Sequence, residues 1–186
     1  MIPVAHFCMV VALLTPPAAD EEQSAADPAL AQVLADPEVG PVVRQAMAFR
    51  DEGNGDAALE QLRKANAVLK RKHGSAHPEQ LPILDLAAEI LFEAGRFADA
   101  VPPLERSVSI REGLDSASQP EGNQVAIASS LLLLGKAYAQ TGRPDRAVDA
   151  LARAAVIFGT TLGEDHDATA ATRRELEAAA TTKEAG

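Results

Sequence analysis

The chain has 186 residues, which is enough for one domain with a short leader in front of it. Its formal net charge is −10 and its pI is about 4.8, so nucleic acid, whose phosphates need a basic surface, is excluded as a partner. Only 3% of the residues are aromatic and none is tryptophan, which favours closely packed helices over strands.

The first segment is an apolar run from Val4 to Leu14, followed by small residues up to Ala19 and then by acidic residues. The run is too short to cross a bilayer as a helix but has the length of a signal-peptide core, although no lysine or arginine precedes it. We therefore expect residues 1–19 to be a cleaved signal peptide and the protein to be periplasmic or secreted, with no stable membrane span after cleavage. Cys8 lies inside the run, so the mature chain would have no cysteine. The alternative is an apolar tail on a cytoplasmic protein.

Residues 20–40 are predicted to be a linker that contains one short helix. Asp27 and Pro28 suit the cap and the first turn of a helix through Leu34. The proline- and glycine-containing segment from Asp36 to Pro41 then breaks the chain. The repeats are expected to begin after this break.

The next feature is a sequence pattern that occurs three times: a glycine, with an alanine five residues and a leucine nine residues after that glycine. The copies are Gly53, Ala58 and Leu62; Gly95, Ala100 and Leu104; and Gly142, Ala147 and Leu151. The residue seven positions before each glycine is small (Ala46, Ala88, Gly135), and the residue four before it is large (Phe49, Leu91, Tyr138). The glycines are 42 and 47 residues apart, a spacing typical of stacked repeat units. One such unit cannot bury its own apolar face, so the spacing predicts a stack with an extended surface.

Each unit is predicted to be a helix, a tight turn and a second helix. Glycine suits the left-handed position that ends a helix, so the three repeated glycines mark the turns. Apolar residues then recur every three to four positions, which predicts second helices over about 56–72, 97–112 and 144–161. Pro102 and Pro103 are expected to interrupt the middle one.

The chain resembles the tetratricopeptide repeats, in the longer form found in kinesin light chains and bacterial relatives. The likeness rests on Leu134–Tyr138 followed by Gly142-Arg143, on Leu104–Glu112, and on the joints Gly74–Pro78 and Gly163–Asp167, which carry His77 and His166. The resemblance implies an all-α fold, an α-solenoid of about three helical hairpins. One further helix, over about 168–182, has no partner and is expected to be the C-terminal capping helix.

The resemblance covers residues 39–183 and gives the expected layout. The repeat domain is expected over residues 41–183, with units at about 41–75, 78–115 and 124–163 and the cap at 167–183. The middle joint, Asp115–Pro120, lacks the glycine and the histidine, and five further residues, Glu121–Val125, follow it. The stack is expected to be most distorted there, as a loop or an extended helix start. Three units and a cap are near the minimum for stability, so we expect a marginal monomer that can form a homodimer.

The histidines raise the question of a metal site. His73 and His77 are four residues apart, with Glu79 and His166 as further candidate ligands. A glycine and a proline place this segment in a turn, and one histidine recurs at the same repeat position, so a structural role at the joint is the better interpretation. The sequence has no phosphate-binding loop, nucleophile elbow or Cys-His pair. We therefore predict no metal, no cofactor and no enzyme activity.

In tetratricopeptide stacks the first helix of each pair lines a concave groove that holds peptide ligands. By offset from the turn glycines, the resemblance assigns groove positions to Val43, Met47, Arg50 and Asp51, to Asp85, Glu89, Phe92 and Glu93, and to Ser129, Leu132, Lys136 and Gln140. This set has three apolar anchors beside an acidic patch, and the lysine and asparagine clamp that some relatives use for C-terminal carboxylates is absent. The predicted partner is a peptide or protein segment with basic and apolar residues. The competing interpretation of the acidic residues is a solvated helix surface.

Two functions from different classes follow from these observations. The first is a non-catalytic interaction module, an adaptor or scaffold that holds a partner's segment in the groove. The second is a structural or assembly protein of the cell envelope, which self-associates or forms part of a larger complex.

Overall fold

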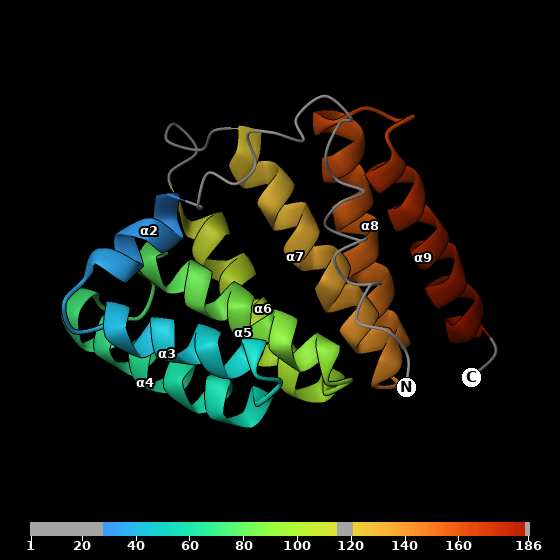
Figure 1. Ribbon diagram of the computed structural model, residues 1–186. Coiled ribbons are helices and arrows are strands. Elements are labelled where there is room, and N and C mark those ends of the chain that lie inside the picture. The colour runs from blue at the N-terminus through green and yellow to red at the C-terminus, as the bar shows by residue number, and fades with distance from the viewer. Residues whose placement is uncertain (1–27, 115–120, 185–186) are drawn as a thin grey trace. The chain divides into compact units, whose positions relative to one another are not determined.

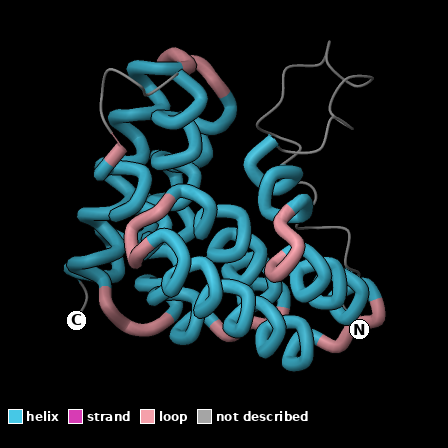
Figure 2. Tube along the Cα trace, turned by 90° about the vertical axis from the view of Figure 1, so that its left-hand side faces the viewer, coloured by secondary structure: helices cyan, strands magenta, loops and turns pink. Residues whose placement is uncertain are grey.

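The computed structural model describes residues 28–114 and 121–184 of the chain (Figure 1). The expected signal peptide, the first part of the expected linker and the middle joint Asp115–Pro120 lie outside these residues. Figure 2 shows the described residues as helices joined by short loops, with no strand among them. Among them, no helix combines the length and the apolar character that crossing a bilayer requires.

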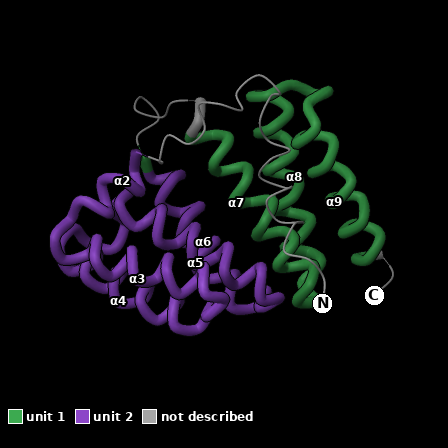
Figure 3. The backbone as a smooth tube through the Cα atoms, in the orientation of Figure 1, with its two compact units in different colours: residues 1–20, 114–186 green, residues 21–113 purple. Residues whose placement is uncertain are grey.

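The helices form two compact units (Figure 3), each described here by itself. One unit contains α2 (Pro28–Ala35), α3 (Gly40–Asp51), α4 (Gly55–His73), the 3-10 turn η2 (Pro78–Gln80), α5 (Leu81–Glu93) and α6 (Phe97–Gly113). The other contains α7 (Glu121–Gln140), α8 (Pro144–Thr161) and α9 (Asp167–Glu184). Helices α3 and α4, α5 and α6, and α7 and α8 pack as hairpins, and α9 packs on α8. The all-α fold of three hairpins and a C-terminal capping helix is thereby confirmed.

The three repeated glycines end the first helices of the hairpins. Gly53, Gly95 and Gly142 have φ values of 76°, 67° and 69°, in the left-handed region that glycine adopts without strain. The next residue in each case donates a backbone hydrogen bond to the large repeat residue, Phe49, Leu91 or Tyr138, at 2.8, 2.8 and 2.9 Å. This six-residue closure is the Schellman cap. The large residue of each repeat therefore closes the turn with its backbone carbonyl and fills space with its side chain.

The repeated alanines and leucines are the core. Ala58, Ala100 and Ala147 are fully buried, and Leu62, Leu104 and Leu151 are each 1% exposed. In the third hairpin the small position is Gly135, where a Cβ atom would lie 2.5 Å from Cγ of Leu151. Small residues here let the two helices of a hairpin approach closely. The small residue before the turn glycine and the leucine after it therefore face each other across the third hairpin.

Helix α6 differs from the expectation, whereas helix α7 takes one of the two expected forms, an extended helix start. Helix α6 runs without a break through Pro102 and Pro103, although each proline removes one helical N–H donor. Buried Val101 and Leu104 flank the pair, and their packing holds the helix against the loss. Helix α7 begins at Glu121, so the five residues that lengthen the middle repeat belong to a longer helix.

The segment before the first repeat packs into its unit. Val33 in α2 and Val39 before α3 are 1% and 0% exposed. Between them the Asp36 carboxylate accepts hydrogen bonds from the backbone N–H groups of Glu38 and Val39, at 2.8 and 2.9 Å. This side-chain turn starts α3 and directs the chain back along α2.

Candidate peptide-binding face

The acidic residues of α5 form a stripe along one side of that helix. Asp85, Glu89 and Glu93 are each four residues apart, so they lie one above another on a helical face. Like charges at this spacing repel one another. The structure gives the three carboxylates different surroundings, which decides which of them a ligand would meet.

Asp85 is already paired within its own hairpin. Its carboxylate receives two guanidinium hydrogen bonds from Arg111 of α6, at 2.6 and 3.3 Å, and the hydroxyl of Ser107 at 2.7 Å. Arg111 is 9% exposed and also contacts Ser107. Such a two-pronged pair is among the stronger polar contacts in proteins. Asp85 therefore holds α5 to α6, and its charge is compensated.

Glu89 has no such partner. It is half-buried, and within the described residues no hydrogen bond or ion pair reaches its carboxylate. Burial raises the pKa of Glu89 above its ordinary value, and the neighbouring charges of Asp85 and Glu93 add to this, while Arg50 of α3 opposes it. A half-buried carboxylate that has no direct ion-pair partner among the described residues, and only the more distant charge of Arg50 to offset its burial, is destabilising, which marks Glu89 as a candidate contact for a cationic ligand group.

This surrounding predicts a pH-dependent effect of Glu89→Gln. Because the pKa of Glu89 is raised in the folded state, protonation of this carboxyl group favours folding. This contribution is fully present at pH values below the ordinary pKa of 4.5 and is lost as the pH rises through the folded-state pKa. At pH 7 the ionised carboxylate is therefore a cost that glutamine removes. We expect Glu89→Gln to raise the thermal midpoint at pH 7 but not at pH 4. Melting curves of the exposed control Glu93→Gln at both pH values should show no such difference, and an equal shift would contradict the assignment.

The other predicted positions of α3 and α5 divide into surface and core. Met47 and Phe92 are partly exposed, and the Phe92 ring packs edge-on against Phe97 at 5.2 Å between centroids. Arg50 is partly exposed and pairs with exposed Asp51 at 3.1 Å. Val43, in contrast, is fully buried and belongs to the core.

The predicted positions of α7 lie in the other unit. Ser129 donates to the carbonyl of Val125 in its own helix, at 3.0 Å, and Leu132 is 8% exposed. Lys136 pairs with Glu175 of α9 at 3.1 Å, and Gln140 is exposed at the helix end. Lys136 therefore ties the capping helix to its hairpin. The face considered below consists of Met47, Arg50, Glu89, Phe92 and Glu93 of the first unit.

Sequence reasoning missed the partners of Asp85. Ser107 and Arg111 enter the sequence analysis only as members of the segment Leu104–Glu112 that carries the family resemblance. Their spacing of four residues on α6 was the available signal, because it places both on one helical face. No local pattern says that this face meets Asp85, which lies 22 and 26 residues earlier.

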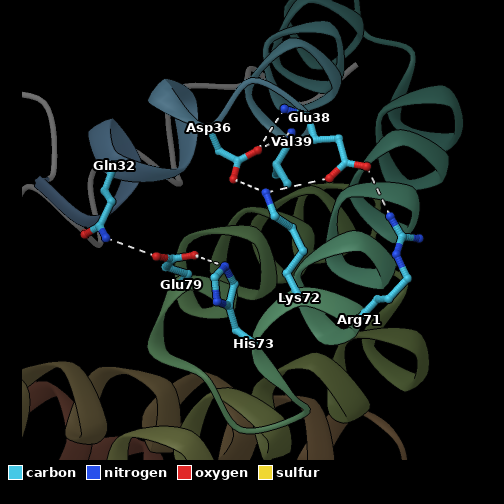
Figure 4. Close-up of polar contacts among 8 residues, drawn as sticks. All are labelled: Gln32, Asp36, Glu38, Val39, Arg71, Lys72, His73 and Glu79. Atoms are coloured by element: carbon cyan, nitrogen blue, oxygen red, sulfur yellow. Dashed lines mark hydrogen bonds and ion pairs between the residues drawn. The ribbon is translucent and has the colours of Figure 1, made fainter.

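The joint between α4 and α5 is held by polar contacts (Figure 4). Lys72 lies 2.5 Å from the carboxylate of Asp36 and 3.7 Å from that of Glu38. The Lys72 ammonium and the two backbone donors lower the pKa of Asp36 to about 2. Glu79 contacts His73 at 3.3 Å and accepts from the Gln32 amide at 3.0 Å. These contacts fasten α2 and the start of the second repeat to the end of α4.

Both joint histidines accept a backbone hydrogen bond. Nδ1 of His77 accepts from the N–H of Glu79 at 3.4 Å, and Nδ1 of His166 accepts from the N–H of Ala168 at 3.1 Å. Each histidine thus caps the start of the following helical segment, which is the structural role expected from their repeat position.

The structure brings His73, His77 and Glu79 together, with one candidate ligand atom of each within 4.8 Å of the others. The cap bond is unfavourable for a metal here. A neutral imidazole that accepts at Nδ1 carries its proton on Nε2, so neither nitrogen of His77 offers a free lone pair. His166 belongs to the other unit. We therefore still predict that the cluster of His73, His77 and Glu79 binds no metal.

Comparisons with known proteins agree with these repeats. Two family models described as tetratricopeptide repeat match the chain, one over residues 42–113 and one over residues 127–168. One similar solved structure, from Podosopora anserina, is described as the nearly identical TPR-like repeats of a kinesin light chain. Its sequence is 25% identical to this chain, and the two structures match with a TM-score of 0.63 over 83% of this chain and 75% of that one. BtubC (BKLC) from P. vanneervenii is 17% identical, with a TM-score of 0.60 over 72% of this chain. The match spans about half of BtubC, at 51%. None of the curated proteins matches the chain.

Proposed function

Because this chain belongs to the tetratricopeptide repeat family, of the kinesin light chain-like type, we propose that it is a non-catalytic adaptor or scaffold that binds a peptide segment on the face formed by α3 and α5. Tetratricopeptide repeats generally mediate protein–protein interaction. The observation that carries the proposal is the half-buried carboxylate of Glu89, which no hydrogen bond or ion pair from the described residues reaches.

The chemistry of this face specifies the segment. Asp85 is paired with Arg111 and Asp51 with Arg50, so Glu89 and Glu93 are the two carboxylates of this face that have no ion-pair partner among the described residues. Met47 and Phe92 supply partly exposed apolar surface on the same two helices. A lysine or arginine of the ligand would pair with Glu89 and remove its desolvation cost, while a large apolar side chain would pack on the apolar residues. The partner segment is therefore basic and apolar.

The test is a selection of phage-displayed peptides on the purified full chain, followed by binding measurements on synthetic copies. We expect the selected peptides to combine lysine or arginine with large apolar residues. Glu89→Lys with Glu93→Lys should weaken their binding at least about tenfold, because attraction becomes repulsion. The control is Asp145→Lys with Asp149→Lys on α8, an exposed pair at the same spacing. Unchanged binding by the α5 variant, or equal loss in the control, would contradict the proposal.

Self-association as an envelope assembly protein is the second hypothesis. Among the described residues, Val156 is the only large apolar side chain that is strongly exposed, at 66%. One such side chain falls far short of the roughly 800 Å² per partner that a stable interface buries. Sedimentation of concentrated and diluted protein decides between the two, since a constant monomer mass contradicts the assembly role.

We also propose export, which rests on the apolar run of the sequence alone. Mass spectrometry of the protein from its native cells tests this. A chain that still begins at Met1 would contradict cleavage.

A further inference from the structure

A second candidate site lies on the opposite side of α5. Helices α4, α5 and α6 line a pocket of about 500 Å³ that is open to solvent. Its α5 residues are Ile83, Leu84, Ala87 and Leu91. At 100° per residue these residues point away from Glu89 and Glu93. The pocket is therefore separate from the proposed peptide-binding face.

The pocket lining combines apolar residues with basic ones. Leu59 and Leu62 of α4 join the α5 residues, and the rings of Pro102 and Pro103 of α6 add rigid apolar surface. The charged residues of the lining are Arg63, Lys70, Arg96, Arg106 and one acid, Asp99. Four cations around one acid is an unusual lining in a protein whose net charge is −10. The lining is therefore complementary to an anion.

Two of the four cations are uncompensated. Arg96 is paired with Asp56 and Asp99, at 2.7 and 2.8 Å, and Arg63 with Glu60 at 3.2 Å. Lys70 and Arg106 form no ion pair within the described part of the chain. Positive charge is thus left over on this pocket's lining.

Arg106 supplies the strongest argument. Its Nε and Nη2 atoms are buried and have no hydrogen-bond partner among the described residues, and the same is true of the amide oxygen of Asn66, which also lines the pocket. Buried donors without acceptors are costly, so an arrangement of this kind is normally completed by a water molecule, an ion or a bound group. Nε and Nη2 form one edge of the guanidinium, and that edge matches the two oxygens of a carboxylate.

We propose that this pocket binds a small amphipathic carboxylate, for which the Arg106 side chain turns its buried Nε/Nη2 edge toward the pocket to meet the head group, while the apolar body lies against the leucines of α4 and α5. The volume lies in the range of pockets that enclose a single small ligand. The carboxylate satisfies both buried donors at once, and Lys70 adds a second positive charge to the lining. The site needs no residue of the peptide-binding face.

Titration of the full chain with decanoate, below its micellar range, tests the proposal by calorimetry. We expect saturable binding at one site. Decanol, which lacks the charge, and decyltrimethylammonium, which reverses it, should bind at least tenfold more weakly. Equal binding of decanol, or no saturable binding of decanoate, would overturn the proposal. An acidic peptide that binds where decanoate does not would also overturn it.

Variants of Arg106 locate the site. Arg106→Met keeps an apolar stem and should reduce decanoate affinity at least tenfold, while the melting temperature holds or rises because an uncompensated buried charge is removed. Arg106→Lys keeps the charge but loses the two-donor edge, so it should also bind more weakly than the native chain. The control is Arg174→Met, at an exposed position of α9, and this variant should bind decanoate as the native chain does. Unchanged affinity in Arg106→Met would refute the site. Unchanged decanoate binding in the Glu89→Lys, Glu93→Lys variant would show that the two sites are independent.

Discussion

Gly40→Ala is expected to lower the free energy of unfolding by about 3 kcal/mol, the upper end of the cost of overpacking. A Cβ atom at this position would lie 2.2 Å from the carbonyl oxygen and 2.8 Å from the carbonyl carbon of Leu34. Both are backbone atoms, so no side chain can turn aside to make room. The last turn of α2 would have to move away from α3, and buried Val33 and Val39 would lose their packing. Denaturant unfolding followed by circular dichroism measures the loss.

The control for this prediction is Gly113→Ala at the end of α6. Apart from the adjoining helix backbone, no atom of the described residues lies within 4 Å of a Cβ atom built there, and the backbone is not left-handed. Alanine is the better helix former, so this variant should be neutral or more stable by about 0.5 kcal/mol. Equal unfolding curves for Gly40→Ala and the native chain would show that α2 is not held against α3 as described.

Asp85→Ala is expected to cost about 2–3 kcal/mol. Breaking a fully buried ion pair costs about 3–5 kcal/mol, because the remaining charge loses its partner in a poorly solvated site. Arg111 is nearly buried, but the Asp85 side chain is 35% exposed, which places this pair below that range. Asp85→Asn should cost less, because the amide oxygen still accepts from Ser107. The same denaturant unfolding experiment applies.

The matched control is Asp99→Ala, which removes the exposed partner of Arg96. Both side chains of that pair are more than two-fifths exposed, and exposed pairs contribute about 0–1 kcal/mol. A loss at Asp99 as large as the loss at Asp85 would mean that burial does not set the difference between the pairs.

Most of the fold could be predicted because its signals are local. The repeated glycine ends a helix through its own backbone conformation, and the repeated alanine and leucine face the core through helical periodicity. These properties depend on residues within about ten positions of one another. The departure from these predictions arises from tertiary packing and not from a local signal. Pro102 and Pro103 predict a break locally, and the packing of their neighbours overrides it.

The candidate sites were less predictable. Asp85 and Glu89 are the same kind of residue on the same stripe of one helix, and the sequence treats them alike. The structure pairs Asp85 with Arg111 and leaves Glu89 half-buried, with no ion-pair partner in the part of the chain that it describes. Val43 fits the groove pattern as well as Met47 does, yet it is fully buried. No pattern along the chain separates the members of these two pairs.

The sequence by itself determined the family, the helical hairpins, their turns and the residues that fill the core, because each follows from spacing along one or two helices. Only the tertiary structure decided which charges are compensated and where a pocket opens. Those outcomes depend on side chains from segments more than 20 residues apart, such as Arg111 with Asp85, or Arg106 with the leucines of α4. The repeat glycines predict that the helices pair, and the packed hairpins decide which carboxylate and which guanidinium are left for a ligand.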